Sequence, residues 1–192
     1  DMLFITAGMG GGTGTGATPI IAQAAKELGI LTVAVVTKPF DFEGRRTQIA
    51  KEGISELVNY VDSLIVIPNE KLMGVLGEEV TFVDAFGAAN NVLNSAVEGI
   101  AEIINNPGLI NVDFSDVKTV MSEMGVAVIG SGFSEGPDRA ISAAKEAVSC
   151  PLLEEVNLNN AKGILVNISA SKDFKMREYF EVMDHIKKYA AE

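Results

Sequence analysis

The chain has 192 residues, a formal net charge of −11 and a sequence pI near 4.6. Such an acidic chain has no basic excess with which to displace counterions from nucleic-acid phosphates, which excludes a general nucleic-acid binder. Its 47% hydrophobic and 21% charged residues are typical of a globular protein, and the single cysteine, Cys150, excludes an intrachain disulfide. No apolar run is long enough to cross a bilayer, so we expect a cytoplasmic protein without membrane insertion.

The first part of the chain alternates between strand and helix patterns. The predicted strands are 2–7, 30–36 and 63–67, and the predicted helices are 19–28 and 46–59. Pro19 near the start of the first helix and Gly29 after its end are typical helix boundaries. Strands that alternate with helices favour βαβ units and a parallel sheet.

A long helix pattern follows, and a second unit begins after it. Apolar residues keep helical spacing from about residue 80 to 105, roughly seven turns, and helices of this length often bridge two lobes. Beyond it we predict helices at 115–124, 137–148 and 176–190 and strands at 126–129 and 163–168. The expected fold is α/β: a partial Rossmann-like parallel-sheet domain at 1–79, a central connecting helix at 80–105 and a partial α+β domain at 106–192.

The most informative segment is the glycine-rich stretch from Gly8 to Gly16, which reads Gly-Met-Gly-Gly-Gly-Thr-Gly-Thr-Gly. It follows a predicted strand and precedes a predicted helix. Glycines there let the backbone approach a phosphate closely, and they aim backbone N–H groups and a helix N-terminus at an anion. Thr13 and Thr15 add hydroxyl donors. Glycine-rich turns also occur simply as tight connections, so the pattern alone leaves both interpretations open.

Two common kinds of phosphate loop do not fit the sequence. A Walker A loop ends in Gly-Lys-Ser/Thr, and no lysine occurs before Lys26. A dinucleotide fingerprint needs an acidic residue at the end of the next strand, where this chain has Val36-Thr37-Lys38-Pro39. A Rossmann-type nucleotide-binding enzyme is therefore the weaker alternative.

The run from Gly10 to Gly16 matches the signature of the tubulin/FtsZ superfamily. Further segments, spread over almost the whole chain, resemble the FtsZ family within it: Thr37–Phe40, Phe42–Arg45, Ile67–Asn69, Asp84–Phe86, Asn111–Phe114 and Met121–Gly125. The resemblance implies a tubulin/FtsZ-like fold and a cytoskeletal GTPase that polymerises head-to-tail into filaments of the bacterial division ring at mid-cell. It also implies that GTP is hydrolysed at the interface between subunits.

The resemblance assigns contacts with GTP or GDP to several segments. The glycine loop would hold the phosphates, Glu43 the ribose, and Arg46 would replace a basic residue that the family has near ribose and phosphate. Asn69 would contact base or ribose, Phe86 would stack on guanine, and Asn90 would hydrogen-bond to it. Without the family, Glu43 reads as an exposed acid, Phe86 as core and Asn90 as a solvated residue. The implied nucleotide-binding residues are Gly8, Gly10, Gly11, Gly12, Thr13, Gly14, Thr37, Pro39, Glu43, Arg46, Asn69, Phe86 and Asn90.

The segment after the long helix carries the implied catalytic residues, Asn111, Asp113 and Asp116. In the FtsZ family this loop protrudes from the face opposite the nucleotide and enters the neighbouring subunit's site. Carboxylates there can orient the water that attacks the γ-phosphate, with Mg²⁺ bound through the phosphates and no metal site in the chain itself. Read locally, the same acids cap a helix N-terminus and complement its dipole.

The resemblance further implies that the chain is an internal fragment. N-terminal strands with a second phosphate loop, and the C-terminal end, would lie outside it, as would the regions that contact division-ring proteins and membrane anchors. We therefore expect GTPase activity in the complete parent protein and none in the isolated chain. The alternative is an assembly-incompetent fragment that only docks on or caps filaments.

Overall fold

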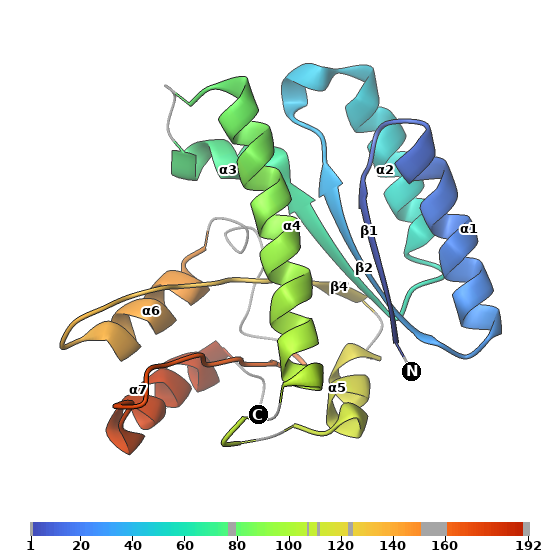
Figure 1. Cartoon of the computed structure of the whole chain (residues 1–192). Coiled ribbons are helices and arrows are strands. Elements are labelled where there is room, and N and C mark those ends of the chain that lie inside the picture. Colours follow the sequence, from blue (N-terminus) through green and yellow to red (C-terminus); the bar gives the residue numbers. More distant parts are fainter. Residues whose placement is uncertain are drawn as a thin grey trace. The chain divides into compact units, whose positions relative to one another are not determined.

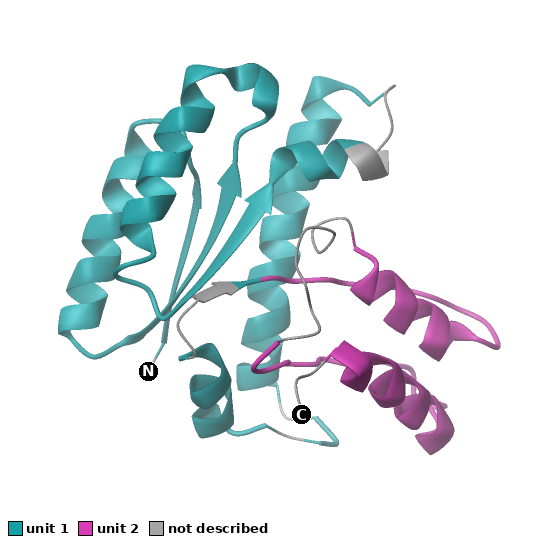
Figure 2. Ribbon diagram, turned by 180° about the vertical axis from the view of Figure 1, so that it is seen from behind, with its two compact units in different colours: residues 1–127 teal, residues 128–192 magenta. Residues whose placement is uncertain are grey.

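The computed structural model describes residues 2–76, 80–106, 108–110, 112–122, 125–150 and 161–189. It divides into two compact units, residues 1–127 and residues 128–192 (Figure 2). Each unit has a hydrophobic core of its own, so the two are described in turn.

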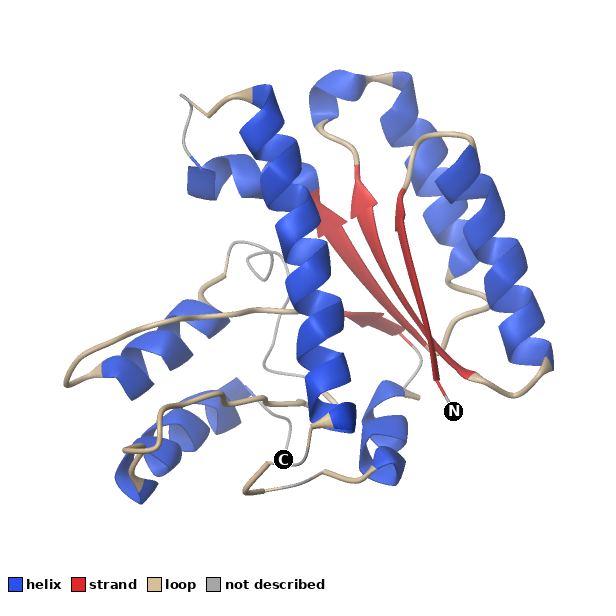
Figure 3. Ribbon diagram, in the orientation of Figure 1, coloured by secondary structure: helices blue, strands red, loops and turns tan. Residues whose placement is uncertain are grey.

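Unit 1 is built on a parallel sheet of four strands, β1 (Met2–Gly8), β2 (Leu31–Lys38), β3 (Ser63–Pro68) and β4 (Gly125–Ala127). Within the described residues the strand order is β1-β2-β3-β4, and every pairing is parallel (Figure 3). All of β2 except its last residue is buried, because an inner parallel strand has both faces covered. The parallel α/β sheet predicted from the sequence is confirmed.

Helices cover both faces of this sheet (Figure 1). On one face lie α1 (Thr13–Glu27) and α2 (Arg45–Leu57), and α4 (Phe82–Asn105) crosses the other. The core on the α1/α2 side consists of Ile5, Met9, Ala22, Ala34, Val36, Ala50, Leu57, Val61 and Leu64. The alternate residues of β2, Val33 and Val35, are fully buried on the opposite face, where α4 packs against this strand.

The first helix, α1, begins at Thr13 and not near Pro19 as the sequence predicts. Pro19 lies inside the helix and is buried together with Thr18. Proline lacks the N–H of the helical bond, and glycine has a low helix propensity, so the local signals argue against helix in this segment. Tertiary packing of the buried residues outweighs these preferences. The second half of the glycine stretch is therefore helical.

Two further helices and the long α4 complete unit 1. β3 runs directly into α3 (Asn69–Leu76), a short helix that was not predicted from the sequence. α4 confirms the long helix predicted at 80–105, and its N-cap, Thr81, accepts a hydrogen bond at Oγ1 from Asp84 N (3.2 Å). α5 (Phe114–Met121) precedes β4. Of the helices in the described ranges, none is long and apolar enough to span a membrane.

Unit 2 contains α6 (Arg139–Val148), α7 (Met176–Ile186) and a closing 3₁₀ turn, η4 (Lys187–Tyr189). Among its described residues, Ala140, Ala144 and Val182 form a hydrophobic core, with Ile168 and Ile186 packed against them. The strand predicted at 163–168 is wrong, because the structure places these residues outside any strand. Ile168 packs on the helical core of this unit.

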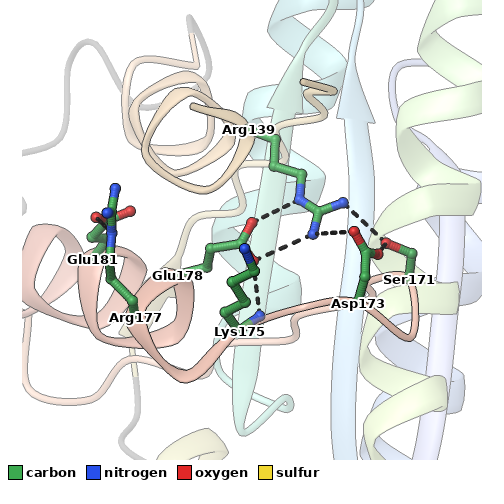
Figure 4. A network of polar contacts seen from close by, with 7 residues as sticks. All are labelled: Arg139, Ser171, Asp173, Lys175, Arg177, Glu178 and Glu181. Carbon is green, nitrogen blue, oxygen red and sulfur yellow. Dashed lines mark hydrogen bonds and ion pairs between the residues drawn. The ribbon is translucent and has the colours of Figure 1, made fainter. Parts of the chain in front are cut away.

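A polar network connects the start of α6 with the start of α7 (Figure 4). Arg139 donates from Nε to Glu178 Oε1 (2.7 Å) and from Nη2 to Glu178 Oε2 (3.3 Å). It also donates to Ser171 Oγ (3.0 Å) and Asp173 Oδ2 (3.2 Å), and the Ser171 hydroxyl donates to Asp173. Glu178 accepts a further bond from Lys175 N (2.8 Å) at the N-cap of α7. The forked guanidinium therefore orients two helices that share only a small core.

Acid should weaken unit 2, because both carboxylates of this network have lowered pKa values. The hydrogen bond from Arg139 lowers the pKa of Glu178, and hydrogen bonds from Ser171 and Arg139 lower the pKa of Asp173. The stabilisation is therefore complete above the ordinary values of 4.5 and 3.8, and it is lost as pH falls below them. We expect Glu178→Gln to lower the unfolding temperature at neutral pH and to make it less sensitive to acid.

Thermal unfolding followed by circular dichroism, at neutral pH and at pH values below 4.5, measures this effect. Glu181→Gln is the matched control, because the pair of Glu181 with Arg177 is exposed and such pairs contribute little. Equal shifts of the unfolding temperature in both variants would contradict the stabilising role of the network.

Candidate functional site

The residues predicted to bind nucleotide follow the carboxyl ends of the strands of unit 1. In the sheet register Gly8 of β1 pairs with Thr37 of β2, and Thr37 pairs with Ile67 of β3. The three strands therefore end level with one another, and the glycine loop, the segment after β2 and Asn69 come directly after them (Figure 1). In open parallel sheets ligands bind outside this edge. The candidate site lies here.

Gly10 is closely enclosed within the glycine loop. Its φ of +104° is a left-handed conformation that favours glycine. Its N–H donates to Thr15 Oγ1 (2.8 Å). A Cβ on Gly10 would lie 2.7 Å from Arg46 O and 2.7 Å from Pro39 Cγ. The loop is thus pressed against α2 and against the segment after β2.

The open side of the loop lies at Gly11 and Gly12, where an added Cβ would meet nothing within 4 Å. The first helical bond of α1 runs from Gly16 N to Gly12 O (3.0 Å), so the preceding amides have no helical partner. The N-cap Gly12 makes no side-chain cap bond, and the first turn of α1 contains no acidic residue. The positive end of the helix is therefore uncompensated and suited to a phosphate.

Three further residues of the predicted phosphate site adjoin this open side. Thr13, the first residue of α1, is exposed beside Gly12. Gly14 packs so closely on the end of β1 that a Cβ would lie 2.6 Å from Gly8 O. Gly8 itself is exposed. The first turn of α1 is thus held tightly against the strand that precedes the loop.

Thr37 and Pro39 lie behind the loop, and both are buried. Thr37 O accepts a hydrogen bond from Met9 N (3.0 Å). Pro39 closes the space beside Gly10, where no side chain fits. The structure therefore positions both residues as supports of the loop backbone.

Glu43 and Arg46 lie where the 3₁₀ turn η1 (Asp41–Glu43) meets α2. Glu43 Oε1 accepts a hydrogen bond from Phe40 N (3.0 Å), and its Oε2 accepts one from Arg46 Nη1 (3.1 Å). The side chain of Glu43 is 11% exposed and that of Arg46 is 65% exposed. A fixed carboxylate and an accessible guanidinium thus stand together, which suits a ribose hydroxyl and a phosphate respectively.

Asn69 is the first residue of α3 and is 4% exposed. Its Oδ1 is buried without a hydrogen-bond partner, alone among the side-chain atoms of the described residues. An unsatisfied buried acceptor costs about 1–3 kcal/mol, so native structures rarely keep one unless water or a ligand completes it. The amide at this edge of the sheet therefore fits a donor such as a ribose hydroxyl or a base N–H.

Phe86 of α4 belongs to an aromatic cluster beside η1. Its ring packs edge to face on Phe40 (centroids 5.2 Å apart, interplanar angle 88°), and Phe40 stacks on Phe42 (5.2 Å, 10°). Phe40 is buried, whereas Phe86 is 43% exposed and keeps ring surface available for stacking. Asn90, one helical turn further along α4, is exposed on the same side.

The predicted catalytic acids, Asp113 and Asp116, lie at the other end of the sheet. Their helix, α5, leads into β4, whose Gly125 pairs with Ser63 at the start of β3. α5 therefore stands at the amino ends of the strands, opposite the glycine loop (Figure 1). Asp113 is the N-cap of α5, its Oδ1 accepts a hydrogen bond from Asp116 N (2.9 Å), and both residues are exposed. Asn111 lies outside the described residues.

Two residues that shape the site were absent from the predicted set. The sequence pointed to Thr15 only as a hydroxyl donor, whereas in the structure its Oγ1 accepts the hydrogen bond of Gly10 N. Glu70 of α3 accepts a hydrogen bond at Oε2 from Asp41 N (3.1 Å) and so ties α3 to η1. No pattern in the sequence pointed to Glu70, because the two partners belong to different elements.

In the part of the chain that the structure describes, no group of three or more His, Cys, Asp or Glu side chains is arranged to hold a metal ion. The groups around the glycine loop are amides and hydroxyls, and Glu43 is paired with Arg46. Mg²⁺ takes oxygen ligands and is commonly bound through substrate phosphates. The donor set therefore fits a cation that is held by phosphate oxygens.

Two family models match the chain. The GTPase domain of the Tubulin/FtsZ family matches residues 1–77, and the C-terminal domain of the FtsZ family matches residues 125–192. The first match contains the glycine loop and the supports behind it, and the second begins at β4.

Curated relatives and solved structures agree with these matches. The whole chain is 61% identical to "Cell division protein FtsZ" of Coxiella burnetii, of which it covers 50%, and 61% identical to that of Pseudomonas aeruginosa, of which it covers 49%. It thus spans about half the length of these relatives. The solved structure of an FtsZ dimer of M. jannaschii matches this chain with a TM-score of 0.94 and 44% identity. The match covers 100% of this chain and 55% of the M. jannaschii chain. CetZ of Methanosaeta thermophila shares the fold, with a TM-score of 0.77 and 19% identity over 99% of this chain and 55% of its own.

Proposed function

Because this chain belongs to the FtsZ family, we propose that it is part of a cytoskeletal GTPase that polymerises head-to-tail and hydrolyses GTP between subunits. Its curated relatives are cell division proteins, which supports filaments that build the division ring in the cytoplasm at mid-cell. A solved relative is an FtsZ dimer, which supports self-association. Division-ring proteins and membrane anchors are the further partners we propose.

One observation carries the proposal: the glycine loop and the acidic pair stand at opposite ends of one sheet. α4, with 24 residues and a length of about 36 Å, extends along the sheet between these ends. Asp113 and Asp116 therefore do not reach the glycine loop of their own subunit. A second subunit stacked head-to-tail brings the two together, and a heterologous contact of this kind repeats into an open filament.

On the nucleotide side, the chain offers one group for each part of GTP. The open amides at Gly11 and Gly12 face the phosphates, and the uncompensated helix end stabilises their charge. Glu43 is placed for the ribose, and the orphaned oxygen of Asn69 accepts from ribose or base. Phe86 provides the stacking surface for guanine, and Asn90 provides an amide beside it.

On the catalytic side, the exposed carboxylates of one subunit act on the nucleotide of the next. Asp113 and Asp116 accept hydrogen bonds from the attacking water, orient it in line with the γ-phosphate and increase its nucleophilicity. Asn111 helps to position that water. When bound through the phosphates, Mg²⁺ supplies charge neutralisation of the transferred group. The products are GDP and phosphate.

The dependence of GTP turnover on protein concentration tests this function in the full-length protein. Turnover per subunit should be close to zero below a threshold concentration and rise steeply above it, because each site is completed by a neighbour. Light scattering in the same samples should show assembly at the same threshold. Binding of fluorescently labelled GTP should persist below it. A turnover per subunit that stays constant with concentration would contradict hydrolysis between subunits.

A further inference from the structure

Thr15 determines which amides of the glycine loop are available to a ligand. Its Oγ1 accepts the hydrogen bond of Gly10 N at 2.8 Å. Gly10 is also confined by Arg46 O and by Pro39, each 2.7 Å from where a Cβ would stand. The N–H of Gly10 is therefore already hydrogen-bonded within the protein. The amides on the open side of the loop are those of the next residues, Gly11 and Gly12.

The position of Thr15 in turn depends on a glycine in α2, Gly53, which has no side chain. Gly53 is buried, and a Cβ on it would lie 2.3 Å from Thr15 Cγ2 and 3.0 Å from Met9 Cε. The first distance is far inside van der Waals contact, so a side chain at this position must displace Thr15 or α2. Arg46 lies two helical turns before Gly53 on the same face of α2, and its backbone oxygen borders Gly10. α2 thus supports the glycine loop at two points.

We propose that Gly53 is a positioning residue for the phosphates of the bound nucleotide, acting through Thr15 on Gly10. The inference rests on the proposed function, since it takes the ligand of the loop to be a nucleoside di- or triphosphate. Gly53 itself touches neither ligand nor reacting atoms. Its missing side chain lets α1 approach α2, and this approach places Thr15 Oγ1. The hydroxyl then holds the Gly10 amide inward, so that the next amides face the phosphates.

Three changes in the full-length protein separate this role from general stability. Gly53→Ala introduces the Cβ that collides with Thr15 Cγ2. Thr15→Ser removes that methyl and keeps the hydroxyl, so the double variant loses the 2.3 Å collision and retains the bond to Gly10. The closest remaining neighbour of the added Cβ is Met9 Cε at 3.0 Å, the far end of a flexible side chain. Thr15→Val keeps the shape of the side chain and removes the hydroxyl. Gly99→Ala is the matched control, because a Cβ there, on α4, meets nothing within 4 Å.

Equilibrium binding of GDP is the measurement, with the unfolding temperature of each variant recorded alongside. Gly53→Ala and Thr15→Val should each weaken GDP binding by about tenfold, because the bond that orients Gly10 is displaced or lost. Gly53→Ala combined with Thr15→Ser should bind within about twofold of Thr15→Ser alone. Gly99→Ala should bind GDP like the wild-type protein. A merely structural effect of Gly53→Ala would not be reversed by removing one methyl group.

Two results would overturn the role of Gly53: unchanged GDP affinity in Thr15→Val, or no recovery of Gly53→Ala when Thr15→Ser is added. If Gly53→Ala alone does not fold, recovery of a folded protein that binds GDP in the double variant with Thr15→Ser tests the contact with Gly53. Thr15→Val, in which valine has the shape of threonine, then tests the bond to Gly10. Failure of the wild-type protein to bind GDP is a different result, since it would refute the proposed function itself.

Discussion

Replacing Asp113 by Asn in the full-length protein should lower GTP turnover by about a hundredfold or more and leave nucleotide affinity unchanged. Asp113 is the N-cap of α5, which lies at the amino ends of the strands, opposite the glycine loop of its own subunit. Asparagine preserves the N-cap, because its side-chain oxygen can still accept the hydrogen bond that Asp116 N now donates at 2.9 Å. The variant therefore removes the charge and keeps the helix.

Phosphate release above the assembly threshold and GDP binding below it are the two measurements for this prediction. Asp116→Asn should also lower turnover, and Asp113→Ala should in addition lose about 1 kcal/mol of stability, because it removes the cap. Glu56→Gln, which removes an exposed acid from α2, is the control for net charge. If Asp113→Asn weakened nucleotide binding as strongly as turnover, the catalytic assignment would be wrong.

Phe40→Ala should destabilise the full-length protein by about 3–5 kcal/mol, the usual effect of removing a buried aromatic ring. Phe40 is 1% exposed, and its ring contacts both Phe42 and Phe86. The substitution leaves a cavity under the ring that we propose to stack on guanine. Binding of GDP should therefore weaken as well, under conditions where the variant is still folded. Chemical unfolding followed by circular dichroism gives the free energy, and GDP titration gives the affinity.

Two further variants serve as comparisons for the destabilisation by Phe40→Ala. Phe40→Leu keeps most of the apolar volume, so it should lose mainly the ring–ring contacts, about 0.5–1.5 kcal/mol for each pair. Phe42→Ala removes a ring that is 62% exposed, and its effect on the free energy of unfolding should be much smaller. Similar destabilisation by Phe40→Ala and Phe42→Ala would show that burial of Phe40 does not support the cluster.

Local patterns in the sequence were sufficient to predict the framework of unit 1. The run at 30–36, which is rich in β-branched residues, corresponds to β2, and the helical spacing at 80–105 corresponds to α4. Side-chain periodicity reports directly which faces are buried, so these long elements are predictable. The predictions failed where packing opposes local preference: α1 begins at Thr13 within the glycine stretch, and residues 163–168 form no strand.

The site was predictable in its parts but not in its arrangement. The glycine stretch between a strand and a helix, and the acids at the start of α5, are visible in chain order alone. Neither the orphaned oxygen of Asn69 nor the bond from Gly10 to Thr15 has a signature, because both depend on what surrounds a side chain after folding. The sequence therefore identified candidate site residues, but it did not show which of their polar groups already form hydrogen bonds within the protein.

By itself, the sequence contained the motifs that resemble the family. Its residue types and their spacing also predicted the parallel sheet and the position of the glycine loop after β1. Only the tertiary structure decided that Gly53 of α2 borders Thr15 of α1, and that Arg139 joins Glu178. The register of β4 on β3 also places the acidic pair at the far end of the sheet, which the family resemblance already implied. These contacts join residues distant in the chain, and the packing of whole elements sets them, which no local pattern encodes.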